Sequence, residues 1–345
     1  MKRKLTLLIV LALTLCLVLA FSSCVYGGNE ELGHNYEDGY CTVCGVKQPY
    51  TRVDEDTIEF GMYPQTEVTD STLVSTLNSL AGTKPTSSNS YNWTSYGYYI
   101  SGSVSNYMWY VDVGEMYRGV YFTSYRPYFT TDSSSTDNTD QDDNGYTTSN
   151  IYWFKYEPIS WTILNESNGT ALILCDMIID SQEYYPSTGS HTVNGATVYA
   201  NNYEYSTIRK WLNETFYNTA FNDLQKEIIL TTTVDNSVAS TGKSTNLYAC
   251  EDTEDKVFLL SYKELTTYLT TNDSRMKKTT DYAQSQGAYT STSSSYLGNG
   301  SWWLRSPGGS NSGFARTVNY DGCVNYNNYV YFTGGVVVPA LQIQL

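Results

Sequence analysis

The chain has 345 residues and a formal net charge of −15, and 16% of its residues are charged, against roughly 25% in a typical soluble domain. It contains 34 tyrosines and 7 tryptophans and is 41% hydrophobic, which is enough to bury a sizeable core and excludes wholesale disorder. An acidic surface repels phosphate groups, and nucleic acid is therefore excluded as a partner.

Residues 1–23 resemble the signal peptide of a bacterial lipoprotein. Basic residues at 2–4 precede an apolar run over 5–21, and Phe-Ser-Ser-Cys follows at 21–24. In lipoproteins the cysteine of such a box is lipidated and becomes the first mature residue, so we expect Cys24 to anchor the protein to the extracellular face of the cytoplasmic membrane. Loss of three basic residues changes the net charge to 17 − 35 = −18. An uncleaved anchor or plain secretion is the alternative.

A tether over 24–33 leads into a small unit and linker over 34–56. The unit contains His34, Cys41 and Cys44 in an H-x6-C-x2-C arrangement. Zinc favours thiolate and imidazole ligands, and structural sites usually have four, so zinc is the expected cofactor if a nearby carboxylate or a second molecule completes the set. The arrangement resembles small zinc-ribbon-like modules of exported bacterial proteins. A Cys41–Cys44 disulfide or two free thiols are the alternatives.

The main domain is expected over 57–345. Leucines at helical spacing behind Asp70 predict a capped helix over 70–80. Residues 83–150 lack clear periodicity, are aromatic and polar, and end in an acidic run. This region is therefore expected to be an irregular insertion.

The rest of the chain alternates strand and helix signals. Ser206 and the S-x-x-E sequence at Ser261 predict two capped helices, and an amphipathic segment is expected at 221–229. Strands are expected at 151–154, 161–164, 171–179, 257–260, 302–305, 315–320 and 336–345. The pattern predicts an α+β fold with mid-chain helices and a mostly antiparallel sheet.

Five sequence motifs carry a resemblance to a known family. They are I-E-F-G-M-Y-P-Q-T at 58–66, Y-E-P-I-S-W at 156–161, Y-S-T-I-R-K-W-L-N at 205–213, W-W-L-R-S-P-G at 302–308 and G-V-V-V-P-A-L at 335–341. Over 57–345 the chain resembles the domain-of-unknown-function family 6273 of exported Gram-positive bacterial proteins, which is distantly similar to C-type-lectin-like and formylglycine-generating-enzyme-like folds. The resemblance implies a C-type-lectin-like main domain and no particular activity. Val338 stands where the last motif of the family has arginine, so any contact of that arginine is absent.

The acidic run contains part of a calcium-loop pattern. Asp140, Asp142 and Asn144 occupy the first, third and fifth positions of D-x-[DN]-x-[DN]-G, but Ile151 stands where the loop needs a bidentate carboxylate. A solvated acidic loop is therefore favoured over a calcium site.

Groups suited to catalysis are sparse. The main domain has a single histidine, His191, and the sequence holds no nucleophile elbow, P-loop or dinucleotide fingerprint. In the W-W-L-R motif, Trp302 and Trp303 precede Arg305 on an expected core strand. An ion pair between Arg305 and a buried carboxylate is favoured over a role in a binding site.

A non-catalytic binding domain displayed at the cell surface is the favoured function. Irregular segments such as 91–110 are rich in Tyr, Ser, Gly and Asn, a mixture typical of recognition loops. The aromatic residues expected to contact a glycan or protein ligand are Tyr96, Tyr98, Tyr99, Trp109 and Tyr110. A structural envelope protein rich in strand-forming tyrosines, or a remote enzyme acting at the cell envelope, is the alternative.

Overall fold

The structure is a computed structural model with two compact units, Met1–Thr51 and Arg52–Leu345. It describes residues 36–37, 39–43, 45, 48–100, 103–105, 107–126, 140–332 and 335–345. The predicted lipidation site Cys24 and the predicted zinc ligands His34 and Cys44 lie outside these residues. Within the described part of the chain, no helix is long and apolar enough to cross a membrane.

The first unit contains a two-stranded antiparallel ribbon. β1 (Tyr36–Glu37) pairs with β2 (Tyr40–Cys41), and Gly39 between them has a φ of 77°, which glycine adopts without steric cost. The Cys41 side chain is 3% exposed. The one expected zinc ligand that the structure describes is therefore buried at the end of β2.

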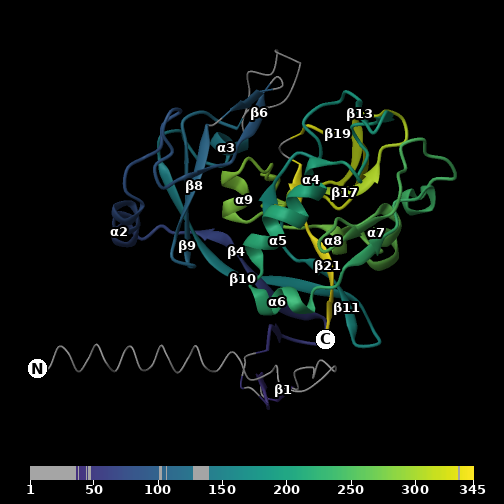
Figure 1. The fold of residues 1–345 in the computed structure, drawn as a ribbon, viewed down its shortest axis with the longest axis horizontal. Helices are drawn as coiled ribbons and strands as arrows, with labels where there is room; N and C mark the ends of the chain where they lie inside the picture. The colour runs from purple at the N-terminus through teal and green to yellow at the C-terminus, as the bar shows by residue number, and fades with distance from the viewer. Residues whose placement is uncertain are drawn as a thin grey trace, which may run out of the picture. The chain divides into compact units, whose positions relative to one another are not determined.

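A curled antiparallel sheet dominates the second unit. Its strands follow the order β21-β11-β10-β9-β8-β5, and β4 also pairs with β10. The long strand β10 has three partners, β4, β9 and β11, and Figure 1 shows it passing from the β8–β9 side of the unit toward β21. The strands are β4 (Thr57–Glu67), β5 (Thr94–Ser95), β8 (Met108–Val113), β9 (Tyr117–Phe122), β10 (Ile151–Ser167), β11 (Thr170–Cys175) and β21 (Ala340–Gln344).

A bulge in β4 contributes to the curl. The register between β10 and β4 shifts between Pro158 and Ser160, and Gly61 of β4 has a φ of 77°. A Cβ atom at Gly61 would lie 2.6 Å from the Phe221 ring, so only glycine lets the strand bend here and pass close to the helical segment. Tyr63, just beyond the bend, is buried.

A smaller sheet carries the W-W-L-R motif. Its order is β12-β20-β17-β18-β19, with β17 and β20 parallel and the other pairs antiparallel. Trp302 and Trp303 are fully buried, and their indole nitrogens donate to the backbone carbonyls of Arg275 at 3.0 Å and Gln182 at 2.9 Å. The strands are β12 (Asp180–Ser181), β17 (Trp302–Pro307), β18 (Phe314–Val318), β19 (Val324–Tyr329) and β20 (Val336–Val337).

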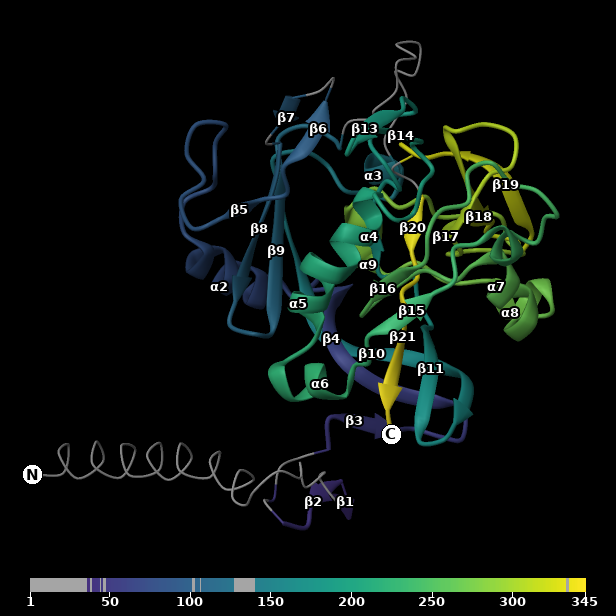
Figure 2. The same ribbon diagram turned by 45° about the vertical axis from the view of Figure 1, so that its right-hand side comes forward.

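Short helices lie between the β8–β9 strands and the β17–β19 strands, as Figures 1 and 2 show. α4 (Thr207–Trp211) starts at Ser206, whose Oγ accepts a hydrogen bond from the Arg209 backbone N–H at 3.2 Å. It continues as the π-helix η1 (Leu212–Phe216) into α5 (Tyr217–Ala220), and α9 (Asp281–Ser285) lies nearby. The predicted helix start at Ser206 is confirmed.

Two further helix starts are confirmed by their caps. The Asp70 side chain accepts from the Leu73 N–H at the start of α2 (Ser71–Ala81). Ser261 and Glu264 form a reciprocal capping box at the start of α7 (Tyr262–Tyr268). Leu77 and Ala81 on the inner face of α2 pack in one buried cluster with Trp93 and with the sheet residues Trp109, Tyr121 and Trp153.

The expected irregular insertion at 83–150 is wrong where β8 and β9 form. These two strands pair with each other and extend the curled sheet from β10. Tyr and Val suit a pleated, half-buried surface, and Gly119 gives the Trp153 ring room, since a Cβ there would lie 2.9 Å from it. Trp109 and Tyr110, which were expected in a recognition loop, are thus strand residues of the curled sheet.

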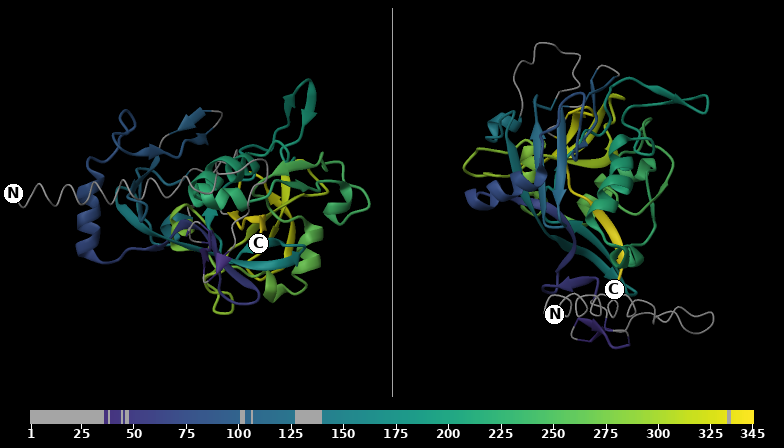
Figure 3. Two further views of the ribbon diagram at one scale, coloured as in Figure 1. Left: turned by 60° about the horizontal axis from the view of Figure 1, so that its bottom comes forward. Right: turned by 60° about the vertical axis from the view of Figure 1, so that its left-hand side comes forward.

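The remaining elements are small. In Figure 3 the β13–β14 hairpin, coloured teal, projects from the rest of the unit. These elements are β3 (Tyr50–Arg52), β6 (Tyr98–Ile100), β7 (Ser103–Ser105), α3 (Asp140–Asp143), β13 (His191–Val193), β14 (Ala196–Val198), α6 (Asp223–Ile228), β15 (Thr232–Val234), η2 (Val238–Thr241), β16 (Thr253–Asp255) and α8 (Asn272–Arg275).

Candidate functional site

A cavity of about 200 Å³ lies where the curled sheet meets the helices. We call it the aromatic pocket. One wall comes from β4, β8, β9 and the end of β5 with the residue after it. The other comes from β12 with the residue after it, from α9 and from the run of α4, η1 and α5. The lining residues are Tyr63, Ser95, Tyr96, Tyr110, Arg118, Asp180, Gln182, Trp211, Thr215, Thr219 and Tyr282.

A buried carboxylate lies at one side of the pocket. The Tyr63 hydroxyl donates to Asp180 Oδ2 at 2.6 Å, and both side chains are 2% exposed. Burial raises the pKa of Asp180, and the hydrogen bond from Tyr63 acts against that rise. Burial first and then the Asp180 charge raise the pKa of Tyr63 well above its ordinary value. Tyr63 therefore stays protonated and acts as the donor.

Neighbouring groups hold the other oxygen of Asp180. Its Oδ1 accepts from the Ser181 backbone N–H at 2.7 Å and from Gln182 Nε2 at 3.2 Å. The charge of Arg126 also lowers the pKa of Asp180, and Arg126 itself pairs with Glu183 at 2.9 Å. The carboxylate is thus fixed in place while Gln182 brings an amide to the pocket wall.

Arg118 forms a cationic part of the opposite wall. Its Nε and Nη2 donate to the two carboxylate oxygens of Asp112, each at 2.8 Å. Its Cζ lies 4.2 Å from the Tyr110 ring centroid and 5.5 Å from that of Tyr156. Tyr156 also donates to Asp112 at 3.2 Å. Arg118 is 5% exposed. Because it is buried and paired with Asp112, the position of its guanidinium is set before any ligand binds.

Tyrosine hydroxyls and rings line the space between these charges. The hydroxyl oxygens of Tyr96 and Tyr282 are 2.8 Å apart. Burial raises the pKa of Tyr282 well above its ordinary value, and the nearby charge of Arg118 acts against that rise. The Tyr96 and Tyr110 rings are 5.0 Å apart, and the Tyr63 and Tyr282 rings meet edge to face at 5.7 Å. Such contacts hold rings rigidly and leave both apolar faces and polar tips for a ligand.

The helical wall presents one face to the pocket. Trp211, Thr215 and Thr219 recur at intervals of four residues along α4, η1 and α5 and share that face. Trp211 is half-buried, and its ring stacks on Phe216 at 5.7 Å. The π-helical turn lies directly after Trp211, and such turns occur frequently at functional sites.

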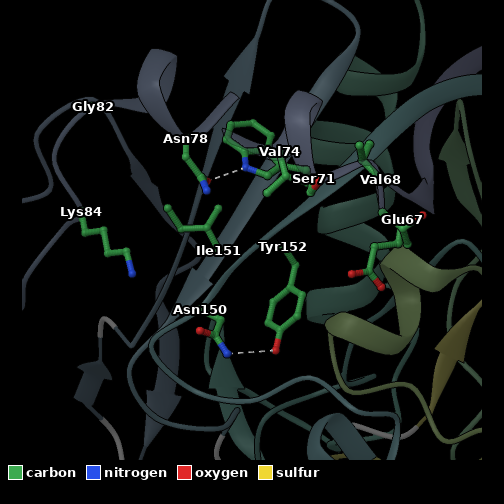
Figure 4. Close-up of a pocket in the computed structure, with 12 residues that line it drawn as sticks. Glu67, Val68, Ser71, Val74, Asn78, Gly82, Lys84, Asn150, Ile151 and Tyr152 are labelled. Atoms are coloured by element: carbon green, nitrogen blue, oxygen red, sulfur yellow. Dashed lines mark hydrogen bonds between the residues drawn. The ribbon is translucent and has the colours of Figure 1, made fainter. Parts of the chain in front are cut away.

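A second, wider depression lies outside α2. This outer groove has a volume of about 670 Å³, and Figure 4 shows Lys84 and Glu67 at its opposite ends with Ile151 between them. Lys84 donates to the Ser149 carbonyl at 2.8 Å, and Glu67 accepts from Tyr146 at 3.2 Å. The outer groove is lined by two aromatic residues, Tyr152 and Trp153, whereas five line the aromatic pocket, so the outer groove offers fewer ring faces to a ligand.

The aromatic pocket is suited to binding a small polar molecule. It combines one carboxylate, one guanidinium, an amide, hydroxyls and aromatic faces, which is the usual make-up of a small-molecule site. His191 lies on β13, stacks on Tyr185 and does not line the pocket. In the part of the chain that the structure describes, no group of three or more His, Cys, Asp and Glu residues is arranged to hold a metal ion.

The five aromatic residues expected to bind ligand lie in different parts of the structure. Tyr96 and Tyr110 line the aromatic pocket. Trp109 is 1% exposed and packs on Tyr121 at 5.9 Å, so it is a core residue and not a surface contact, because alternate residues of β8 face opposite sides of the sheet. Tyr98 and Tyr99 belong to β6 and lie beyond the residues whose side chains the structure describes.

The partial calcium loop forms a helical turn instead of a coordinating loop. Asp140 and Asp142 belong to α3, and Asn144 follows it. The Asn144 side chain donates to the Ala288 carbonyl at 2.9 Å. The segment thus joins the fold through a helical turn and a side-chain contact.

Arg305 belongs to a structural network. It donates to both carboxylate oxygens of Glu264, with Nη2 to Oε1 at 3.0 Å, and to the Leu259 carbonyl at 2.6 Å. Trp302 and Trp303 flank this network from within β17. No residue of the motif lines the aromatic pocket.

Sequence reasoning missed Asp180, Arg118 and Trp211. Trp211 lies in the quoted Y-S-T-I-R-K-W-L-N motif, and Tyr63 lies in the first quoted motif, so the family resemblance pointed to both without giving either a role in a site. Asp180 and Arg118 are isolated charges among strand residues. A charged residue inside an otherwise apolar or aromatic strand is the signal that identifies them.

Together the fold and the pocket define an α+β domain in which a curled antiparallel sheet and a run of short helices enclose a polar aromatic cavity. The family model "Domain of unknown function (DUF6273)" matches residues 168–345, more than half of the chain, and the chain therefore belongs to this family. Comparison with curated proteins and with solved structures gives no match.

The family match covers one wall of the aromatic pocket. Asp180, Trp211 and Tyr282 fall within 168–345, whereas Tyr63 and Arg118 precede it. The matched region thus supplies the buried carboxylate and the helical wall, and the preceding strands supply the guanidinium.

Proposed function

We propose that the unit over Arg52–Leu345 is a non-catalytic binding domain that takes a single sugar residue of a glycan into the aromatic pocket. The observation that carries the proposal is the convergence of Trp211, Tyr96 and Tyr110 with Asp180 and Gln182 around one cavity. Aromatic rings pack on the apolar faces of sugars, and carboxylates and amides bind their hydroxyl groups.

The size of the cavity favours a sugar residue over a protein segment. A volume of about 200 Å³ is below the 300–1,000 Å³ of most drug-sized sites and suits one ring rather than a folded partner. A single carboxylate lines the pocket, so the paired carboxylates that glycoside hydrolysis needs are not offered by the lining residues. A purely structural role leaves the convergence of these groups unexplained.

The proposal extends to the setting of the domain. We propose that Cys24 carries a lipid and holds the protein on the extracellular face of the cytoplasmic membrane. His34, Cys41 and Cys44 are proposed to bind zinc between this anchor and the binding domain. The mixed antiparallel fold and the W-W-L-R strand support a C-type-lectin-like relationship for the domain.

A glycan array followed by calorimetry tests the binding function. The chain from residue 25 onward is expected to bind a subset of saccharides, and Trp211→Ala is expected to weaken the affinity at least about tenfold, since a buried aromatic contact contributes more than about 1.4 kcal/mol. Tyr205→Ala is the matched control, because Tyr205 is 40% exposed and lies outside the pocket. Equal binding by wild type and Trp211→Ala, or no saccharide binding, contradicts the proposal.

A further inference from the structure

Arg316 differs from the other buried arginines of the second unit. It lies on β18 with 0% exposure, and none of its three guanidinium nitrogens has a hydrogen-bond partner among the described residues. Five other described arginines reach a carboxylate, namely Arg52, Arg118, Arg126, Arg209 and Arg305. A buried cation without an anion is costly unless something else compensates the charge.

Two tyrosine rings compensate part of that cost. The Arg316 Cζ lies 4.5 Å from the Tyr262 ring centroid and 4.7 Å from that of Tyr326. The two rings are 6.1 Å apart and tilted by 44°, so they form two walls of a corner around the guanidinium. A ring face attracts the cation but offers no lone pair of a carbonyl or carboxylate type to the N–H donors. The donors of Arg316 therefore lack an acceptor.

The surroundings of this corner add positive charge. Lys243 Nζ lies 5.3 Å from the Tyr326 ring centroid, so a second cation shares this ring with Arg316. The whole chain carries −15, so this pair of cations stands out against the acidic background. Such a pair attracts anions.

We propose that Arg316 forms a binding site for an oxyanion, a carboxylate or phosphate group, with Tyr262 and Tyr326 as its aromatic walls. A guanidinium presents its N–H groups in a planar fork that matches two oxygens of such a group. Lys243 draws the anion toward the site. The site is separate from the aromatic pocket, since none of these residues lines that cavity.

Tyr326 controls access to Arg316. It lies on β19, the edge strand of the five-stranded sheet, and is 39% exposed, whereas Arg316 is fully buried. Rotation of the Tyr326 side chain exposes the guanidinium without disturbing the pairing of β17 with β18. An anion then binds the unpaired N–H groups that the Tyr326 ring had covered.

Calorimetry and thermal unfolding of the full-length chain in detergent test the site. Sodium phosphate and sodium acetate are compared with sodium chloride at equal ionic strength. A saturable rise in Tm and measurable heat with phosphate or acetate, absent with chloride, is expected, and the anion with the lower Kd identifies the chemical group.

The variants decide whether Arg316 is responsible. Arg316→Met keeps the length of the side chain and is expected to lose the anion effect, and Arg316→Lys, which lacks the planar fork, is expected to bind at least tenfold more weakly. Arg52→Met is the matched control and keeps the effect, because Arg52 is an exposed arginine paired with Glu166. No anion-specific effect in the wild type, or an unchanged effect in Arg316→Met, overturns the proposal.

Discussion

Arg118 and Arg316 are both buried arginines placed over tyrosine rings, one in the curled sheet and the other in the five-stranded sheet. The Arg118 Cζ lies 4.2 Å from the Tyr110 centroid, and the Arg316 Cζ lies 4.5 Å from that of Tyr262. The difference is at their N–H groups. Arg118 donates to both carboxylate oxygens of Asp112, whereas Arg316 meets no acceptor in the described chain.

This difference separates a positioning arginine from a binding one. Rings stabilise a guanidinium charge without satisfying its donors. Arg118 is complete within the protein, so it shapes a wall of the aromatic pocket before a ligand arrives. Arg316 is incomplete, so an external oxyanion has donors to satisfy. Removing the acceptor Asp112 is therefore expected to destabilise the region around Arg118. Supplying an acceptor is expected to stabilise the region around Arg316.

The largest effect is expected from Arg305, whose two terminal nitrogens donate four hydrogen bonds, two of them to Glu264. Arg305→Ala leaves Glu264 without its cation, and breaking a buried pair costs about 3–5 kcal/mol of unfolding free energy. The value lies toward the lower end because Glu264 is 28% exposed and solvent screens part of the pair. Chemical denaturation measures the change. Arg52→Ala is the control, with an expected cost below about 1 kcal/mol for an exposed pair, and equal costs for the two variants contradict this prediction.

A smaller loss of unfolding free energy is expected when Arg118, like Arg316, has no carboxylate acceptor. Asp112→Ala removes both acceptors from Arg118, and leaving a buried donor unsatisfied costs about 1–3 kcal/mol. Partial exposure of Asp112, at 35%, places the effect in the lower half of that range. Asp112→Asn keeps one acceptor oxygen and is expected to cost less in the same denaturation measurement. If Asp112→Ala is neutral, the ring contacts alone support Arg118, and the comparison with Arg316 fails.

Asp180 provides a test that depends on pH. Burial raises its pKa in the folded protein, above the roughly 3.9 of an unfolded aspartate. The stability it contributes is thus fully present below about pH 3.9 and is lost as pH rises through the folded pKa. Asp180→Asn removes this titration and keeps an acceptor for Tyr63, so the variant gains stability relative to wild type as pH rises from 4 to 7. A difference in unfolding free energy that stays constant over this range contradicts the expectation.

Local signals in the sequence predicted much of the helical structure. Asp70, Ser206 and Ser261 each cap a helix in the structure, because capping involves residues three apart in the chain. β8 and β9 were missed, because tyrosine suits both recognition loops and strands. Their pairing with β10 also depends on Gly119 and Trp153, which are far apart in sequence.

The candidate site was predictable only in part for the same reason. Tyr96 and Tyr110 were selected by composition, and both line the aromatic pocket. Trp109 was selected by the same composition, but its side chain faces the core. The strand register decides on which side of the sheet a side chain lies. The bond between Tyr63 and Asp180 joins residues 117 positions apart, and no local pattern reports such a contact.

The smallest effect on stability is expected from Arg316→Met. A hydrophobic side chain of similar length replaces a buried charge that has no anion, and such replacements are often neutral or stabilising. Loss of the contacts with the Tyr262 and Tyr326 rings, about 0.5–2 kcal/mol, offsets most of the relief from the three unsatisfied nitrogens. We therefore expect a net change within about 1 kcal/mol, toward higher stability, in a buffer without oxyanions. In saturating phosphate or acetate the sign reverses, because only the wild type gains binding energy. Denaturation in both buffers measures this reversal, and a loss of several kcal/mol without oxyanions shows that Arg316 already has a partner.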